Sequence, residues 1–229
     1  KVDKWPGDDG DFTLWDEVLE DCFNRVTEKG LKVQWDLWEE PNFHGWWAAS
    51  QDQFFATWKY GYEKLHKLDP EAQLVGPSIM KYDPEYLKSF LVFCKENNVL
   101  PDVLSWHEID DWSPEVIPEH VSGARKIMEE LGIEEIPIDI NEVISAKRQT
   151  IPGMAVWYLK GLEDAKVQGA CKSCWMDQKH GDRAIFNGWP PMLDGLLTYP
   201  EFKPRSTWWV HKAYGDITGE LVDVSVSGG

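Results

Sequence analysis

The stretch Trp35-Asp36-Leu37-Trp38-Glu39-Glu40-Pro41-Asn42 decides the fold that we expect for this chain. From Leu31 to Leu37 apolar residues alternate with polar ones, the period of two that is typical of a β-strand. The alternation ends at two adjacent carboxylates, and Pro41 removes the next ladder donor, so the strand must end there. In α/β proteins, ligands bind and catalytic residues gather at the carboxyl ends of the strands. The alternative interpretation is an ordinary turn that happens to be acidic.

A second short and β-branched stretch is Pro137-Ile138-Asp139-Ile140-Asn141-Glu142-Val143-Ile144, which again carries a carboxylate near its end. Glu40 and Glu142 are thus two strand-end glutamates about a hundred positions apart. A retaining glycosidase needs such a pair, because one acid protonates the leaving oxygen and the other attacks the anomeric carbon. So wide a spacing suits a barrel, in which successive strands deliver residues to one mouth.

The composition describes a globular chain and excludes several partners. The chain has 229 residues, of which 42% are hydrophobic and 28% charged, so it can form a substantial core. Its net charge of −17 argues against binding to nucleic acid, whose phosphates need a basic face, and against anionic membrane surfaces. No apolar run approaches the roughly 18 residues that a membrane span requires. We therefore expect neither nucleic acid nor membrane as a partner.

Cysteine and tryptophan are the informative residue types. Four cysteines are too few for a disulfide scaffold, and buried thiols are a better interpretation than a redox pair at Cys171 and Cys174. Tryptophan is unusually frequent, with 14 residues. Aromatic side chains with one polar edge suit sugar rings, although many of them are also expected in the core.

Strand and helix patterns alternate along the whole chain. Strands are predicted near 33–39, 73–77, 103–107, 137–142 and 170–176, each followed by a helix. This is the pattern of a parallel α/β sheet, open or closed into a barrel. No glycine-rich nucleotide-binding motif follows any strand, which disfavours a nucleotide-binding open sheet. A complete (β/α)₈ barrel takes about 250 residues, so five units cannot close one.

At these residues the chain resembles clan A glycoside hydrolases, particularly family 39, which contains β-xylosidases and α-L-iduronidases. The stretch Trp35–Asn42 resembles the family's W-x-x-W-N-E-P-x motif at the end of the fourth barrel strand. Ser105-Trp106-His107 resembles the sixth-strand Ser-Trp-His. The resemblance implies an incomplete TIM barrel that covers strands four to eight in residues 1–219, with residues 220–229 as the start of an accessory β-domain or a tail.

The resemblance also implies roles for individual residues. Glu40 would be the general acid/base and Glu142 the nucleophile of a retaining glycoside hydrolase. The implied substrate contacts are Glu39 beside the acid/base, the pocket histidine His107 and the eighth-strand aromatic residue Trp175. Two loops add further contacts: Asp8 and Asp9 in the loop after the third strand, and His44 and Trp46 in the aromatic loop after Asn42. The substrate would be an oligosaccharide, polysaccharide or simple glycoside, and the location extracellular or periplasmic. No cofactor is expected, because two carboxylates complete the chemistry.

The chain departs from the family pattern at the residue before the acid/base. The family has an asparagine there, which hydrogen-bonds the sugar 2-hydroxyl, whereas this chain has Glu39. A further carboxylate beside Glu40 should raise the pKa of one of them by like-charge repulsion. Glu108 stands where many clan members place a tyrosine that supports the nucleophile.

Two other interpretations remain open from the sequence. A carbohydrate-binding pseudoenzyme would keep the cleft without turnover. An acidic metal site would use Glu39, Glu40, His44 and His107, but the chain lacks a metal-ligand spacing signature. The incomplete barrel also predicts an exposed edge at the first strand, through which the chain could self-associate.

Overall fold

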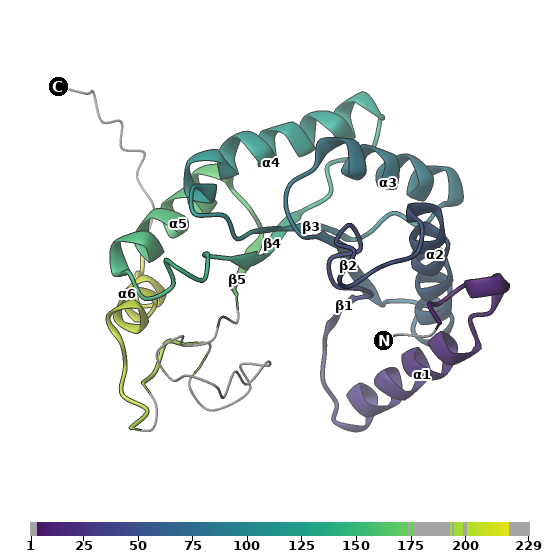
Figure 1. Cartoon of the computed structure of the whole chain (residues 1–229), viewed down its shortest axis with the longest axis horizontal. Helices are drawn as coiled ribbons and strands as arrows, with labels where there is room; N and C mark the ends of the chain where they lie inside the picture. The colour runs from purple at the N-terminus through teal and green to yellow at the C-terminus, as the bar shows by residue number, and fades with distance from the viewer. Residues whose placement is uncertain (1–3, 174, 176–192, 194, 199–200, 220–229) are drawn as a thin grey trace. The chain divides into compact units, whose positions relative to one another are not determined.

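Figure 1 shows the computed structural model of the chain, which describes residues 4–173, 175, 193, 195–198 and 201–219. The chain divides into two compact units, Lys1–Ser145 with Tyr158–Ser173, and Ala146–Trp157 with Cys174–Gly229. The central sheet and the candidate site lie in the first unit. The predicted division into a barrel of residues 1–219 and an accessory segment of residues 220–229 stays a prediction, because that segment is outside the described residues.

The first unit is built on a five-stranded parallel sheet whose spatial order follows the chain. Each strand pairs with the next in parallel, so the predicted α/β architecture of an incomplete barrel is confirmed. Within the described residues the two outer strands have one neighbour each, and the sheet is open. The strands are β1 Gln34–Asp36, β2 Gln73–Ile79, β3 Val103–Glu108, β4 Ile138–Val143 and β5 Gly169–Lys172.

A helix follows every strand, and one helix precedes β1. In Figure 1 the helices between β1 and β4 lie outside the sheet and follow one another around it, which leaves the other face of the sheet for the site. None of the described helices is long and apolar enough to cross a membrane. The helices are α1 Thr13–Glu28, α2 Gln51–Leu68, α3 Pro84–Asn97, α4 Ser113–Glu130, α5 Pro152–Ala165 and α6 Ser206–Gly215, with a short 3₁₀ turn at Asp8–Gly10.

Side chains cap the starts of α2 and α3, whereas α1, α4 and α6 begin without a side-chain cap. Ser50 caps α2 by accepting a hydrogen bond from the backbone N–H of Gln53, and Asp83 caps α3 just before a proline. Thr13 is the first helical residue of α1, and its N–H donates to the side chain of Asp11 at 3.0 Å.

The core lies between the sheet and the outer helices. Trp58 of α2 is 1% exposed and donates its indole N–H to the carbonyl of Val99 at 2.9 Å. A Cβ at Gly76 would lie 2.5 Å from the Trp58 ring, so only glycine allows α2 to pack this closely on β2. The largest fully buried side chains are Trp58, Trp106, Tyr158, Phe54, Phe90, Leu65, Leu74, Ile79, Leu87, Leu91, Leu104 and Ile117.

Both outer strands are shorter than predicted. β1 ends at Asp36, and β5 ends at Lys172 because its last partner, Val143, ends β4. Trp175 therefore lies beyond β5 instead of within it. The cysteine prediction also needs correction, since Cys94 is buried but Cys22 and Cys171 are exposed.

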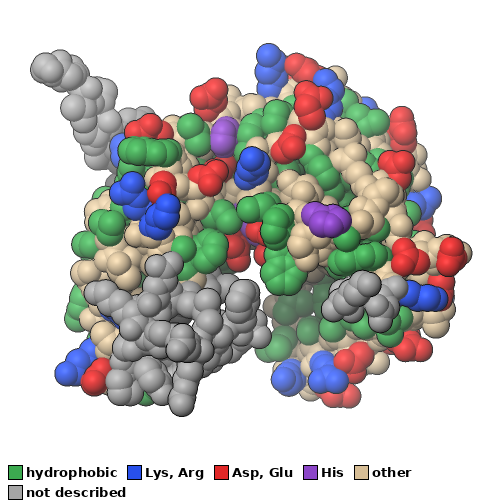
Figure 2. Space-filling view, viewed as in Figure 1, with side chains coloured by type: hydrophobic (Ala, Val, Ile, Leu, Met, Phe, Trp, Pro, Cys, Tyr) green, Lys and Arg blue, Asp and Glu red, His purple; other side chains and the backbone are tan. Residues whose placement is uncertain are grey.

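The described surface mixes charged and apolar side chains, as the face in Figure 2 shows. Near the first strand the exposed fractions are 54% for Leu31 and 40% for Val33. A cavity of about 500 Å³ opens there, lined by Phe23, Leu31, Trp35 and neighbouring residues of α1 and α2. Among the described strands β1 pairs with β2 alone, so the predicted exposed edge at the first strand is present in the described residues.

Candidate active site

The acidic loop after β1 is fastened to the end of β2 at two points. The N–H of Glu40 donates to the carbonyl of Ser78 at 3.0 Å, and the side chain of Asn42 accepts from the N–H of Met80 at 2.9 Å. Glu40 has a φ of 44°, in the left-handed region, which costs a non-glycine residue about 1–2 kcal/mol. These two hydrogen bonds hold that conformation and fix where the Glu40 side chain begins.

Two β-bulges flank β3 at the level of the site. The β2–β3 register shifts between Pro77 and Ile79, and the β3–β4 register shifts between Trp106 and His107. Each shift inserts one extra residue, Ser78 in β2 and Asn141 in β4. Bulges are common beside active sites, where they re-aim side chains. After the second shift His107 stands directly opposite Glu142, so the two side chains leave the sheet on the same face.

The two bulge residues meet in a polar network across four strands. The hydroxyl of Ser78 lies 2.9 Å from that of Ser105 and donates to the carboxylate of Asp36 at 2.5 Å. The amide of Asn141 donates to both Asp36 and Ser78, at 2.9 Å each. This network ties together β1, β2, β3 and β4 near the residues that carry the acids.

Sequence reasoning missed this network. Three members of the network lie close in sequence to predicted site residues: Asp36, Ser105 and Asn141. The contact between Ser78 and Asn141, however, arises only from the two bulges. The one sequence signal was the presence of small polar residues inside otherwise apolar strands. A bulge depends on pairing between strands, and the sequence does not reveal such a register shift.

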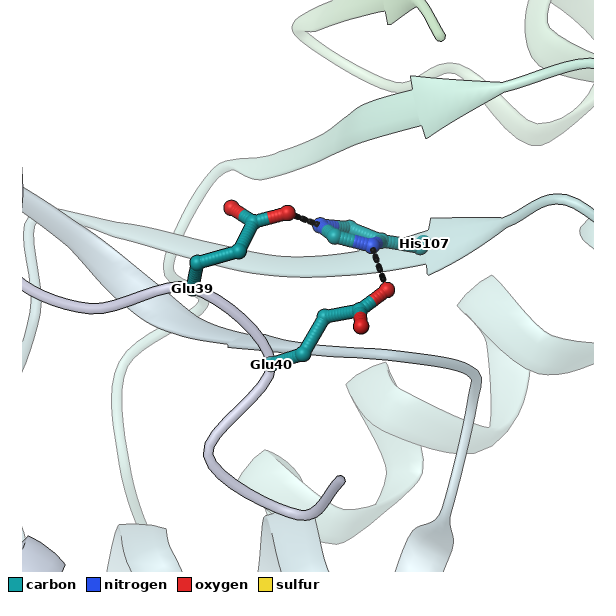
Figure 3. A group of neighbouring side chains, drawn as sticks. All are labelled: Glu39, Glu40 and His107. Carbon is teal, nitrogen blue, oxygen red and sulfur yellow. Dashed lines mark hydrogen bonds and ion pairs between the residues drawn. The ribbon is translucent and has the colours of Figure 1, made fainter. Parts of the chain in front are cut away.

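His107 is the centre of the site and contacts three glutamates. Its Nδ1 lies 3.1 Å from Glu40 Oε1 and 3.8 Å from Glu142 Oε2. Its Nε2 lies 3.9 Å from Glu39 Oε1, on the other side of the ring (Figure 3). The ring itself is fully buried. Both predicted catalytic carboxylates therefore approach the Nδ1 atom of His107. The distance between Glu40 Oε1 and Glu142 Oε2 cannot exceed the sum of their distances to Nδ1, 3.1 and 3.8 Å.

Burial and mutual repulsion shift the pKa values of these groups. Loss of hydration raises the pKa of Glu39 to about 7, with a further contribution from the neighbouring carboxylates and an opposing one from His107. Loss of hydration also raises the pKa of Glu142, again opposed by His107. Burial lowers the pKa of His107, but the hydrogen bond to Glu40 and the three carboxylates outweigh it, so the net shift is upward.

The pKa of Glu39 is thus raised, but burial is the main cause and repulsion by Glu40 contributes least. The Glu39 side chain is 51% exposed, whereas that of Glu40 is 9% exposed and hydrogen-bonded to His107.

Three of these residues could in principle hold a metal ion, because ligand atoms of Glu39, Glu40 and His107 all lie within 4.8 Å of one another. Figure 3 shows, however, that the two glutamates approach opposite nitrogens of the imidazole. One ion could bind only one of those nitrogens, so the set does not fit a single ion without rearrangement. His44, the fourth residue of the predicted metal set, is not among these three.

In the described part of the chain, no hydrogen bond or ion pair joins Asp8, Asp9, His44 or Trp46 to this cluster. Asp8 accepts hydrogen bonds from the N–H of Trp5 at 2.8 Å and from the side chain of Gln53 at 2.8 Å, which gives it a structural role in its loop. Asp9 lies in the same short turn. His44 and Trp46 are exposed in the loop after Asn42, and the carbonyl of Trp46 accepts from the indole of Trp38. Trp175 belongs to the second unit. Their roles in substrate binding stay predictions.

A parallel half-barrel whose strand ends carry paired carboxylates is the arrangement of barrel glycoside hydrolases. The family model of glycosyl hydrolases family 39 matches residues 9–149, and the chain belongs to this family. The resemblance predicted from the two strand-end motifs is thereby confirmed.

Similar proteins support the same family and fold. The chain is 27% identical, over 96% of its length, to a 3-O-β-L-arabinopyranosyl-α-L-arabinofuranosidase of Bifidobacterium pseudocatenulatum, of which it spans 24%. It is 26% identical, over 45% of its length, to a β-xylosidase of Geobacillus stearothermophilus, of which it spans 22%. The chain thus spans about a quarter of the length of these curated relatives.

Solved structures extend the comparison to the fold. A structure from Neocallimastix frontalis superposes with a TM-score of 0.78 at 28% identity, over 94% of this chain and 50% of that one. A family 39 β-xylosidase of Caulobacter crescentus superposes with a TM-score of 0.71 at 17% identity, over 92% of this chain and 48% of that one, which shows the fold alone.

Proposed function

We propose that the chain carries the active site of a retaining glycoside hydrolase, with Glu40 as general acid/base and Glu142 as nucleophile. The observation that carries this proposal is the convergence of both carboxylates on Nδ1 of His107, at 3.1 and 3.8 Å. Family membership and the names of the relatives support a carbohydrate substrate.

The proposed reaction is a double displacement at the anomeric carbon. Ionised Glu142 attacks this carbon while the glycosidic C–O bond breaks, and Glu40 gives its proton to the leaving oxygen. Water then attacks the same carbon, its proton passes to Glu40, and the bond to Glu142 breaks. Each carboxylate ends the cycle in its starting state.

His107 orients both acids in this scheme. Its ring is fully buried, and the β3–β4 register places it opposite Glu142. The hydrogen bond from Nδ1 holds Glu40, so the proton donor is fixed relative to the nucleophile. The positive charge that the ring takes up also compensates part of the negative charge of the cluster.

The experiment that tests this proposal is chemical rescue. Glu142→Ala should abolish turnover of aryl glycosides, and added azide should restore cleavage and yield a glycosyl azide of inverted configuration, because azide fills the space left by the carboxylate. Glu96→Ala on the exposed surface of α3 serves as the matched control and should keep full activity. Equal turnover by the unaltered protein and Glu142→Ala would contradict the proposal.

A second candidate is a carbohydrate-binding protein without turnover. It is favoured by the position of Glu40, whose side chain is only 9% exposed and already hydrogen-bonded to His107. Saturable binding of glycosides with no hydrolysis of activated aryl substrates would support this candidate over the hydrolase.

Self-association through the β1 edge is a separate proposal. It is supported by the exposed apolar side chains of Leu31 and Val33 beside this edge. Sedimentation velocity over a concentration series should show association that Val33→Lys weakens. The expectations of no nucleic acid, no membrane partner and an extracellular or periplasmic location stay predictions.

A further inference from the structure

Ser78 is a fully buried residue that contacts the surroundings of both proposed catalytic acids. Its carbonyl accepts a hydrogen bond from the N–H of Glu40 at 3.0 Å. Its hydroxyl donates to the carboxylate of Asp36 at 2.5 Å and accepts from the amide of Asn141 at 2.9 Å. Ser78 thus touches the loop that carries the proposed acid/base and the residue that directly precedes the proposed nucleophile.

The backbone of Ser78 is strained. Its φ of 53° lies in the left-handed region, which glycine adopts far more readily than other residues do. Strained residues persist where surrounding contacts hold them, and they cluster at functional sites. At this position serine adds only a hydroxyl to what glycine would offer, and this hydroxyl is used in the contacts to Asp36 and Asn141.

These contacts form a continuous path between the two acids. The path runs from Glu40 through its backbone hydrogen bond to Ser78, and then through the side-chain hydrogen bond to Asn141. It ends at Glu142, the next residue of β4. Asp36 accepts from both Ser78 and Asn141, so one carboxylate holds the two donors together.

The amide of Asn141 is oriented from one side only. Its Nδ2 donates to Asp36 and to Ser78 at 2.9 Å each, whereas its Oδ1 is buried without a hydrogen-bond partner among the described residues. The two bonds from Nδ2 therefore determine how this side chain lies. Because Asn141 is the extra residue of the β4 bulge, its orientation also bears on the bulge from which Glu142 projects.

The separation of the two acids is the quantity that such a path can control. A retaining glycosidase needs its two carboxylates about 5–5.5 Å apart. His107 contacts both carboxylates at the ends of their side chains, whereas the path through Ser78 joins the backbones from which those side chains begin. A displacement of about 1 Å at a catalytic group can lower the rate by about 10²-fold.

We propose that Ser78 and Asn141 are positioning residues, and that the hydrogen bond between their side chains fixes the separation of Glu40 and Glu142. This inference rests on the proposed function, since it takes the roles of the two acids from it. In this account neither positioning residue touches the substrate. Both act through the acids, with Asp36 as their shared acceptor.

The first test is Ser78→Gly. Glycine suits a φ of 53° and keeps the backbone carbonyl that holds Glu40, so the variant loses the hydroxyl alone. The substrate is 4-nitrophenyl β-D-xyloside or 4-nitrophenyl α-L-arabinofuranoside, whichever the unaltered chain cleaves faster. The kcat should fall by about 10- to 100-fold while KM stays within about threefold, because the substrate still binds but the acids are misplaced. The melting temperature should stay close to that of the unaltered chain, because relief of backbone strain offsets the lost hydrogen bonds.

The second test is Asn141→Ala, which removes the partner of the same hydrogen bond. It should lower kcat by a similar factor, again with little change in KM. Asn97→Ala is the matched control, because Asn97 is also half-buried and its amide also donates a hydrogen bond, to the carbonyl of Phe93 at 2.9 Å in α3. This control should keep the kcat of the unaltered chain.

The double variant Ser78→Gly with Asn141→Ala tests whether the two side chains act as one unit. If their hydrogen bond is what positions the acids, the double variant should lose about as much kcat as the more impaired single variant. Losses that multiply in the double variant would mean that the side chains act independently, and would overturn the inference.

The other outcomes separate the inference from the proposed function. Full kcat in Ser78→Gly, or a loss in Asn97→Ala equal to that in Asn141→Ala, would overturn the inference and leave the proposed hydrolase intact. A loss of kcat that is explained by unfolding of both variants at the assay temperature would make the network purely structural, with the same consequence. Absence of turnover by the unaltered chain would overturn the proposed function, and the inference with it.

Discussion

Two groups of glutamate and histidine side chains lie on opposite faces of β3, and they differ in how many of their polar atoms have hydrogen-bond partners. On the outer face, Glu108 accepts from the indole of Trp106 at 2.8 Å and from Nδ1 of His120 at 2.7 Å. His120 in turn stacks on Tyr82, with ring centroids 4.3 Å apart. On the inner face, His107 meets three carboxylates and leaves Nε2 without a partner in the described residues.

This difference separates a structural ion pair from a candidate catalytic one. The outer pair has one acid, one base and a neighbouring indole donor, so its hydrogen bonds are largely made within the protein. The inner group has an excess of acids, an unused donor and pKa values shifted upward for Glu39, Glu142 and His107. Perturbed acids with spare hydrogen-bonding capacity are typical of sites that act on a ligand.

The largest expected effect contrasts the acids on the two faces. Glu142→Gln should reduce kcat on aryl glycosides by about 10⁴-fold or more, as is usual for loss of a nucleophile. Glu108→Gln carries the same chemical change on the outer face and should alter kcat by less than about tenfold, because it touches no reacting atom. Steady-state kinetics of both variants check this, and equal losses would remove the distinction between the two pairs.

The next effect concerns proton donation by Glu40. Glu40→Gln should slow the hydrolysis of glycosides with poor leaving groups by about 10²–10⁴-fold, the usual contribution of a general acid. The first step with a good leaving group, such as 2,4-dinitrophenolate, needs no proton and should be nearly unaffected. A plot of rate against leaving-group pKa should therefore become steeper in this variant. An unchanged slope would contradict the role of Glu40.

A smaller effect is expected on stability from the outer pair. Glu108→Leu would leave the Trp106 indole and the His120 ring without their shared acceptor and should lower the free energy of unfolding by about 1–3 kcal/mol. Urea denaturation measures this. Glu39→Gln, at a half-exposed position, is the comparison and should change the free energy of unfolding by much less. A reversed order would mean that the inner cluster is the structural one.

The smallest effect is the pH dependence of stability. The pKa of Glu39 is about 7 in the folded protein against an ordinary value of 4.5, so the folded state binds its proton more tightly than the unfolded state does. Its stabilising contribution is complete below about pH 4.5 and is lost as the pH rises through about 7. His107, Glu142 and Asp36 also have raised pKa values and contribute in the same direction.

The melting temperature should therefore fall between about pH 5 and pH 7.5, and Glu39→Gln should show a fall that is smaller by about a few degrees at most. Glu39 is half-exposed, and solvent screening keeps this contribution small. Calorimetry at both pH values checks the prediction. A steeper fall in Glu39→Gln would contradict the upward shift of the Glu39 pKa.

Most of the fold could be predicted because it rests on local patterns. Alternation before Glu40 and one helix between successive strands sufficed for five parallel strands in chain order. The ends of β1 and β5 could not be predicted, because a strand ends where its partner stops pairing and not where its own apolar residues end.

The site was predictable in its acids but not in its connections. Glu40, Glu142 and His107 were expected from strand ends and from the family resemblance, and the structure places them together. The Ser78–Asn141 contact depends on two register shifts, which arise from pairing between strands. The loose Nε2 contact of His107 likewise depends on the orientation of its ring.

The central claim, that Glu142 is the nucleophile of a double displacement, is tested most directly by trapping the covalent intermediate. The fluorine of a 2-deoxy-2-fluoro glycoside slows both formation and hydrolysis of the glycosyl-enzyme, and a good leaving group keeps its formation the faster of the two. The glycosyl-enzyme therefore accumulates. Mass spectrometry of peptides from the unaltered chain should then show one added fluoroglycosyl group on Glu142, and none in Glu142→Gln. An adduct on Glu39 or Glu40, or turnover of ordinary glycosides with inverted configuration and no adduct, would contradict the account.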